Sequence, residues 1–295
     1  MIKANLEKLV EVSVLGEIVH PKYPESPVLD VGYDGSAFLP VGMGGITYNV
    51  KVGDPAFGWA WGDHIEPGVS IKNGDAKANS ALNHLAAIGN DAVVIHSSGD
   101  AKDAKVQGSV GTVTGKHGGC ERVLVHFPRK VLDRLCIGDK IQIRAAGMGL
   151  ALPDHPDVKV MSCSPRLFKA LNLTEKGGKV RIHVTKILPG KIMGSGLGAT
   201  SAYSGDYDIQ STAETVKEYS LDNLRLGDLV AIQDHDASFG YRWHPGAVTV
   251  GVVIHGASRY AGHGPGVTAL FTSPGGKIEP IIDRKANLAE LLGLA

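Results

Sequence analysis

The sequence is poor in cysteine, in aromatic residues and in long apolar runs, and it has no surplus of either charge. Its three cysteines are widely spaced, which argues against a disulfide scaffold or a Cys-x-x-Cys metal site and fits a reducing cytosol. Thirty basic residues balance thirty acidic ones, so we expect no nucleic-acid partner. No segment approaches the roughly 20 apolar residues of a membrane span, and the charged start lacks the apolar core of a signal peptide. We therefore expect a cytoplasmic protein with no membrane partner.

Glycine, in contrast, is abundant, with 39 residues, or about twice its usual share. Glycine permits tight turns and lets a backbone approach a ligand closely. Apolar residues alternate with polar or small residues in many segments, such as 246–255, which is typical of strands. Helical spacing is rarer, and we expect helices over 75–88 and 284–294, with short helical turns near 129–135, 165–171 and 212–219. These patterns predict a mainly β (α+β) fold.

One pattern occurs twice. Residues 133–143 (DRLCIGDKIQI) and 222–232 (DNLRLGDLVAI) share Asp-x-Leu-x-(Ile/Leu)-Gly-Asp-x-(Ile/Val)-x-Ile. Two interpretations stay open: a Gly-Asp turn that feeds a strand, as many β-barrels use, or two related β units. On the second interpretation, Asp139 and Asp228 occupy equivalent places, each at the start of a strand. We predict two β-barrel or sandwich-like units with a few packed helices, at residues 1–150 and 151–295.

Several strings resemble an uncharacterised family of bacterial and archaeal proteins of unknown function that is known through structural genomics. The strings include MGSGLG (193–198), GDYDIQ (205–210) and GHGPGVT (262–268), and the resemblance extends over about residues 90 to 272. It implies a soluble, mostly β protein with an N-terminal and a C-terminal unit. It implies no reaction, so the candidate site depends on the residues of this sequence alone.

Clusters of acidic residues and histidine are the strongest chemical signal. The string GDHIEPG holds Asp63, His64 and Glu66. Imidazole with carboxylate is a normal ligand set for zinc, manganese or iron, and also a normal general-base pair. In an extended segment, His64 and Glu66 point to the same side. The neighbouring glycine and aromatic residues suit a pocket wall, although solvated polar side chains are the alternative.

A second cluster, QDHDASFG, places Asp234 and Asp236 on one side of an extended segment and His235 on the other. A metal requires at least three converging ligands, so neither cluster completes a site alone. A residue from the C-terminal unit can complete the first cluster. Our predicted metal ligands are therefore His64, Glu66, Asp234, Asp236 and His263.

The segment 243–273 carries two further candidates. His255 ends a strand on its small-residue face, and His263 lies in the turn Gly-His-Gly-Pro-Gly. Strand ends tolerate any polar residue, so an ordinary structural role is the alternative for both. We predict that His64 and Glu66 approach His255 or His263 and wall one pocket. The predicted catalytic residues are Asp63, His64, Glu66, His255 and His263.

Two glycine-rich loops complete the candidate site. Backbone N–H groups in such loops can bind a carboxylate or phosphate, and structural turns are the alternative. Cys120 follows another glycine turn, and a nucleophilic role there would need an activating base such as His117. The predicted cofactor-binding or ligand-binding glycines are Gly194, Gly196, Gly198, Gly262, Gly264 and Gly266.

Three functions remain open at this point. The favoured one is a cytosolic enzyme that acts on a small polar or anionic metabolite by hydrolysis or proton abstraction, with an acid–histidine site between the two units. That site would be suited to a divalent metal ion as its cofactor. The alternatives are a non-catalytic binder of a small anionic ligand through the glycine loops, and a structural oligomer. We also expect the chain to form a homo-oligomer.

Overall fold

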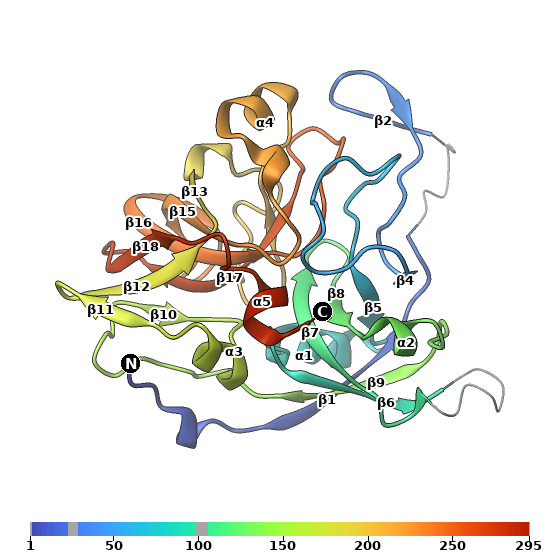
Figure 1. The fold of residues 1–295 in the computed structure, drawn as a ribbon, viewed down its shortest axis with the longest axis horizontal. Helices are drawn as coiled ribbons and strands as arrows, with labels where there is room; N and C mark the ends of the chain where they lie inside the picture. The colour runs from blue at the N-terminus through green and yellow to red at the C-terminus, as the bar shows by residue number, and fades with distance from the viewer. Residues whose placement is uncertain (1, 23–28, 98–105, 295) are drawn as a thin grey trace.

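The computed structural model describes residues 2–22, 29–97 and 106–294. Most of the regular structure is strand, and the strands form two units joined side by side (Figure 1). The fold is therefore mainly β with few helices, as the period-two patterns predict.

The N-terminal unit is a closed barrel of six antiparallel strands. The order β1-β9-β6-β7-β8-β5 closes because β5 also pairs with β1, where Glu17 lies opposite Lys72. Val69, Val113 and Ile141 are buried in its interior. The barrel strands are β1 (Val12–Ile18), β5 (Gly68–Lys72), β6 (Asp91–His96), β7 (Val110–His117), β8 (Arg122–His126) and β9 (Lys140–Ala145), and β4 (Ile46–Thr47) extends it beside β5.

The C-terminal unit is built on a second sheet, in which the long strands β15, β16 and β17 lie side by side. The short strand β14 pairs with the start of β17, which places Asp208 opposite Gly266. The strands of this sheet are β10 (Lys159–Val160), β13 (Lys186–Pro189), β14 (Tyr207–Asp208), β15 (Leu229–Asp236), β16 (Arg242–Val253) and β17 (Gly266–Ser273). Smaller sheets join β11 (Thr174–Lys176), β12 (Lys179–Val184) and β18 (Ile278–Ile282), and β2 (Asp30–Val31) with β3 (Ala37–Phe38).

The helices are short. Asp75 caps the first by accepting a hydrogen bond from the Ala78 N–H, as helix N-cap residues do. The C-terminal helix is shorter than the predicted 284–294, because Asn287 caps its start and the left-handed Gly293 ends it. The helices are α1 (Ala76–Leu85), α2 (Arg129–Leu132), α3 (Pro165–Ala170), α4 (Ala213–Tyr219) and α5 (Leu288–Leu292). Within the described residues, no helix is long and apolar enough to cross a membrane.

The repeated Gly-Asp pattern has the same structure in both units. The Asp139 carboxylate accepts a hydrogen bond from the N–H three residues before it, at 2.9 Å. Asp228 does the same, also at 2.9 Å. Each aspartate immediately precedes a strand, β9 or β15, and Ile141 and Val230 behind them are fully buried. The predicted equivalence of the two turns is confirmed.

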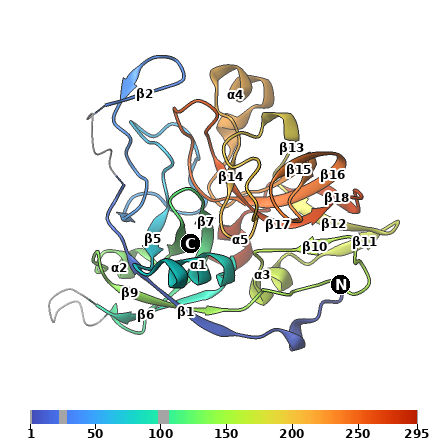
Figure 2. The same ribbon diagram turned by 180° about the vertical axis from the view of Figure 1, so that it is seen from behind.

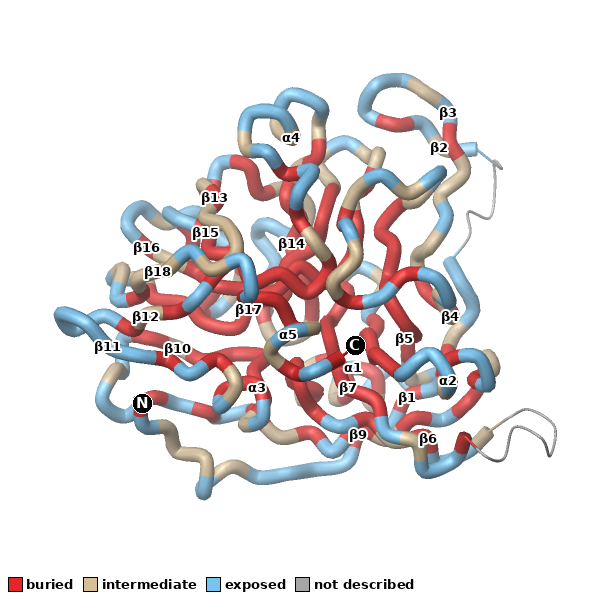
Figure 3. Tube along the Cα trace, in the orientation of Figure 1, coloured by how far each residue is buried: buried red, intermediate tan, exposed pale blue. Residues whose placement is uncertain are grey.

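The two units meet along β7 and β17. The Lys116 N–H donates to the Thr268 hydroxyl at 3.3 Å, and that hydroxyl donates back to the Lys116 carbonyl at 3.2 Å. Gly115 lies against Ile254 so closely that a Cβ atom would approach its side chain to 2.5 Å. The view from behind shows β7, β14 and β17 at this junction (Figure 2). Most residues there are buried (Figure 3). The junction brings the ends of β7 and β16 together.

Candidate metal centre

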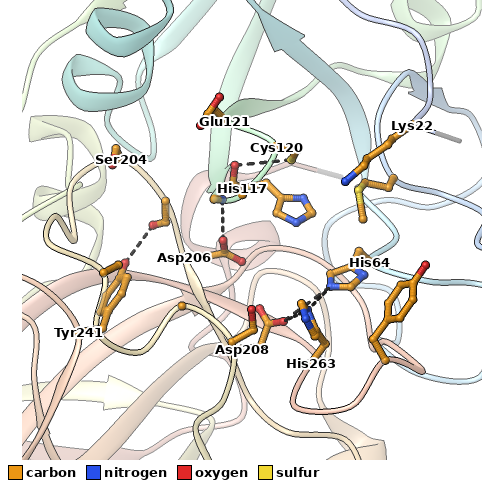
Figure 4. Close-up of a pocket in the computed structure, with 18 of the residues that line it drawn as sticks. Lys22, His64, His117, Cys120, Glu121, Ser204, Asp206, Asp208, Tyr241 and His263 are labelled. Atoms are coloured by element: carbon orange, nitrogen blue, oxygen red, sulfur yellow. Dashed lines mark hydrogen bonds and ion pairs between the residues drawn. The ribbon is translucent and has the colours of Figure 1, made fainter. Parts of the chain in front are cut away.

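A cavity of about 680 Å³ opens between the two units. Its N-terminal wall includes His64, His117 and the turn 118–121 after β7, and its C-terminal wall includes several residues of the segment 195–208 together with His263 (Figure 4). The predicted pocket between the units is thus present. Histidines and aspartates from both sides meet there.

The preceding residue, Asp63, fixes the orientation of the His64 ring. Its Nδ1 donates to Asp63 Oδ2 at 2.5 Å, and Asp63 Oδ1 accepts from Ser258 and from the Arg259 N–H. Its Nε2 faces the other way and lies 3.2 Å from His263 Nδ1. The backbone of His64 has φ of +48°, in the left-handed region that costs a non-glycine residue on the order of 1–3 kcal/mol. The surrounding contacts therefore hold this ring in place against a local backbone preference.

His117 ends β7 and is oriented in the same way. Its Nδ1 contacts the Glu66 carboxylate, which also accepts from the Ser70 hydroxyl. Both His117 and Glu66 are buried. This contact leaves Nε2 of His117 as the available ligand atom.

His255 follows β16 and is fully buried. Its Nδ1 lies 2.9 Å from the Gly256 carbonyl oxygen and 3.3 Å from the Gly266 nitrogen. These two contacts require opposite tautomers, and the shorter one assigns the proton to Nδ1. Nε2 is then the acceptor atom that faces the cluster. All three rings therefore have the arrangement common among metal-binding histidines, in which one nitrogen donates outward to a carboxylate or carbonyl.

Two aspartates face these rings: Asp208 ends β14, and Asp206 directly precedes that strand. Asp206 Oδ2 forms an ion pair with His255 Nε2 at 2.9 Å, although neither atom meets hydrogen-bond geometry with any described residue. Asp208 Oδ2 lies 3.1 Å from His263 Nδ1 and 3.6 Å from His64 Nε2. Two ligand atoms of one metal ion also lie about 3 Å apart. The pair Asp206 and His255 fits two ligands of one metal ion.

The ionisable groups are mutually dependent. Burial disfavours the charged form of His64, but its contacts with Asp208 and Asp63 outweigh burial and raise its pKa to about 10. Burial also opposes ionisation of Asp208, but hydrogen bonds from His263 and His64 hold its pKa well below the usual range. The pKa of buried Glu66 is lowered beside His117. The ionised Asp208 carboxylate thus faces the cavity, where it can stabilise a bound cation as well as an imidazolium.

Groups of potential ligand atoms lie within 4.8 Å of one another in several combinations. The combinations are His64, His117 and His255; His64, Asp208 and His263; Asp206, Asp208 and His255; and Glu66, His117 and Cys120. Burial and the Glu66 carboxylate raise the pKa of the Cys120 thiol, so the nucleophilic thiolate is disfavoured. The site is therefore a cluster of imidazoles and carboxylates.

Asp234 and Asp236 lie outside this cluster, contrary to their predicted role as ligands. Asp234 lies at a bulge of β15 and accepts from the Gly246 N–H at 2.7 Å. Asp236 forms an ion pair with Arg242 at 2.8 Å and accepts from Ser238. Among the described residues, neither belongs to a group of histidine, cysteine or acidic side chains close enough to share a metal ion.

The predicted residues Asp63 and Glu66 are in place, but they lie behind the histidines. The glycine loops also have a steric reason for their composition. A Cβ atom at Gly266 would lie 1.8 Å from Asp206 Oδ2, and one at Gly194 would lie 2.0 Å from the Gly262 carbonyl oxygen. Gly196 lines the cavity beside the candidate ligands, and the Gly264 N–H faces Asp208 Oδ2 at 3.4 Å. These glycines let backbone and ligand groups pack closely, and binding of an exogenous anion by the loops stays a prediction.

The sequence patterns did not single out Asp206 and Asp208 as candidate ligands, and they suggested His117 only as a base for Cys120. The two aspartates had a usable signal, because they are two residues apart in the string GDYDIQ and so point to one side of an extended segment. His117 had no comparable signal. It belongs to the site because β7 and β17 meet, which periodicity does not show.

Comparison with known proteins places the chain in a family. Residues 29–169 match the description "Domain of unknown function (DUF4438), N-terminal", and residues 170–292 match its C-terminal counterpart. The chain belongs to the DUF4438 family. A solved structure titled "Crystal structure of TM1086" is 46% identical to the chain, with a TM-score of 0.91 over 98% of each chain. No curated protein matches. The resemblance to an uncharacterised family and the two-unit, mainly β fold are confirmed.

Proposed function

We propose that the chain is a metal-dependent enzyme that hydrolyses, or abstracts a proton from, a small anionic metabolite in the cavity between its two units. The observation that carries the proposal is the buried pair Asp206 Oδ2 and His255 Nε2, which lie 2.9 Å apart as an ion pair but do not meet hydrogen-bond geometry with each other or with any other described residue. Buried polar atoms in that state are costly unless another group binds both of them.

The ligand set supports a divalent metal of the zinc, manganese or iron type. Imidazole nitrogen and carboxylate oxygen are the normal ligands of these ions. The acceptors behind His64, His117 and His255 hold each ring in one orientation, which supports affinity without touching the ion. When bound, such an ion supplies a water of lowered pKa and polarises a substrate oxygen.

The cavity suits a small anionic substrate. Lys22 lines it and extends toward the histidines, so its ammonium group can bind a substrate carboxylate or phosphate (Figure 4). Ser195, Ser201 and Ser204 also line the cavity. A volume of about 680 Å³ lies in the usual range for small-molecule sites.

The proposal is tested with tag-free protein that is stripped of metal and reloaded with Zn²⁺, Mn²⁺, Fe²⁺ or Co²⁺. We would assay hydrolysis of small amides, esters and lactones that carry a carboxylate or phosphate. Proton abstraction would be measured as exchange of a substrate C–H hydrogen beside a carboxylate for deuterium from D₂O. We expect turnover that depends on the added metal. The variant His255→Ala should lose this turnover. The control His96→Ala, which removes an exposed histidine on β6, should retain it.

The outcomes separate the alternatives. Metal binding without turnover on any of these substrates would favour the non-catalytic binder of a small anionic ligand. A wild-type protein that binds none of the four ions would contradict the metal-dependent proposal itself.

A further inference from the structure

The two oxygens of the Asp208 carboxylate face different ligand groups. Oδ2 lies 3.1 Å from His263 Nδ1 and 3.6 Å from His64 Nε2. Oδ1 lies 3.7 Å from His255 Nε2, and His255 in turn lies 2.9 Å from Asp206. A carboxylate whose oxygens point to separate ligand sets has the geometry of a bridge between two ions.

In each set, the distances between ligand atoms are close to those between neighbouring ligands of one metal ion. Ligand atoms that bind one ion at about 2.1 Å lie about 3.0–3.4 Å apart in octahedral or tetrahedral geometry. In the outer set, the three distances among His64, His263 and Asp208 Oδ2 run from 3.1 to 3.6 Å. In the inner set, His255 lies 2.9 Å from Asp206 and 3.7 Å from Asp208 Oδ1.

The number of ligands also favours two ions. Four histidines and two aspartates supply more side chains than the three that a catalytic zinc usually takes while keeping an open position. His117 completes the inner set, since its ring centroid lies 4.3 Å from that of His255 and 5.6 Å from that of His64. Divided in this way, each ion keeps a place for water or substrate.

We infer that the cavity binds two divalent ions bridged by Asp208. The inner ion is held by Asp206, His117 and His255, and the outer ion is held by His64 and His263. This inference rests on the proposed metal dependence and specifies the centre that would perform it. Paired ions about 3.5–4 Å apart stabilise both the attacking and the leaving oxygen in hydrolysis.

The two positions differ in exposure, which predicts different affinities. The side chains of Asp206 and His255 in the inner set are 4% and 0% exposed. The side chain of His263 in the outer set is 37% exposed. The outer ion should therefore exchange faster with solution, and loss of His263 should remove it without removing the inner ion.

The test is the metal stoichiometry of tag-free protein, measured by elemental analysis after equilibrium dialysis against Mn²⁺ and, separately, Zn²⁺. We expect two ions per chain for the wild type and one for His263→Ala. The matched control His183→Ala, which removes an exposed histidine paired with Asp283, should keep two. Electron paramagnetic resonance of the Mn²⁺-loaded wild type should show exchange coupling between two ions, and His263→Ala should show an isolated ion.

A wild-type protein with one ion per chain and an uncoupled Mn²⁺ spectrum would overturn the two-ion inference and leave the single-metal proposal standing. A wild-type protein with no bound ion would overturn both. Because the decisive values come from the wild type, the inference remains falsifiable even if His263→Ala does not fold.

Discussion

At the scale of single residues, the site is defined as much by the groups behind the histidines as by the histidines themselves. Asp63 and Glu66 fix the rings of His64 and His117 by accepting from their Nδ1 atoms. Such outer groups set ring orientation and ligand basicity, although they do not touch the ion.

Glu66→Gln should weaken metal binding by about 10–100-fold, because the neutral amide no longer holds the His117 ring in its charged contact. The change is nearly isosteric, so the fold should persist. Titration calorimetry with Mn²⁺ measures the effect. The control Glu121→Gln neutralises an exposed carboxylate that lines the same cavity, and it should bind with wild-type affinity. Equal affinities for the two variants would show that Glu66 does not orient a ligand.

Gly266→Ala should disrupt the centre sterically. Its Cβ atom would lie 1.8 Å from Asp206 Oδ2 and 2.3 Å from His255 Nε2, so both ligand atoms would have to move. We expect metal affinity to fall at least tenfold in this variant, as measured by competition with a chromogenic chelator. Gly275→Ala, with open space around the new methyl group, is the matched control. Unchanged affinity in Gly266→Ala would mean that these two atoms are not ligands.

At the scale of elements, the same local pattern has different outcomes on different strands. Acid–histidine spacing pointed to His64, which lines the cavity, and to Glu66, which lies behind it in contact with His117. The same spacing failed for Asp234 and Asp236, because β15 bulges there and Arg242 takes the second carboxylate. Local spacing predicts which way side chains point, but it does not reveal which distant charge will meet them.

His235 on β15 has a structural role with a pH signature. It stacks on Tyr207 with ring centroids 4.6 Å apart, and burial, only partly opposed by Asp236, lowers its pKa to about 4 from 6.5. Between these values the unfolded chain binds a proton here that the folded chain does not. The free energy of unfolding should therefore fall as the pH drops from 6.5 to 4, by up to about 1.4 kcal/mol per pH unit from this ring.

Urea unfolding of the wild type and of His235→Gln across that pH range measures the contribution. The variant should lose less stability on acidification than the wild type does. The exposed His96 provides the matched control, since His96→Gln should leave the wild-type slope unchanged. Parallel slopes for the wild type and His235→Gln would show that this ring is not buried in its neutral form.

At the scale of the whole molecule, the candidate ligands come from both halves of the chain. His64 and His117 belong to the residues that match the N-terminal domain of the family, and Asp206, Asp208 and His255 belong to those that match the C-terminal domain. A metal bound between them would therefore link the stability of the two units.

Metal should accordingly stabilise the entire protein. At a free concentration 100 times the dissociation constant, one site adds about 2.7 kcal/mol to the free energy of unfolding. Chemical denaturation with Mn²⁺ and with EDTA measures this difference. His255→Ala should show a much smaller difference. A wild-type unfolding curve that does not respond to either addition would contradict a metal site between the units.

The mainly β class, the twin Gly-Asp turns and the cavity between the units could be predicted, because each depends on local patterning or on where glycine and polar residues gather. The short α5 could not be, since Asn287 and Gly293 limit it through cap geometry. Nor could the inclusion of His117, which depends on the β7–β17 junction. Long-range pairing of strands decides the final ligand set.

The most direct test of the central claim is anomalous X-ray diffraction from crystals of the tag-free protein loaded with Mn²⁺ or Zn²⁺, with data collected on both sides of the metal's absorption edge. We predict anomalous density in the cavity, about 2.0–2.3 Å from His255 Nε2 and Asp206 Oδ2. We also predict a second peak between His64, His263 and Asp208. Crystals of metal-loaded protein with no anomalous density among these residues, or with density only at Asp234 and Asp236, would contradict the central claim.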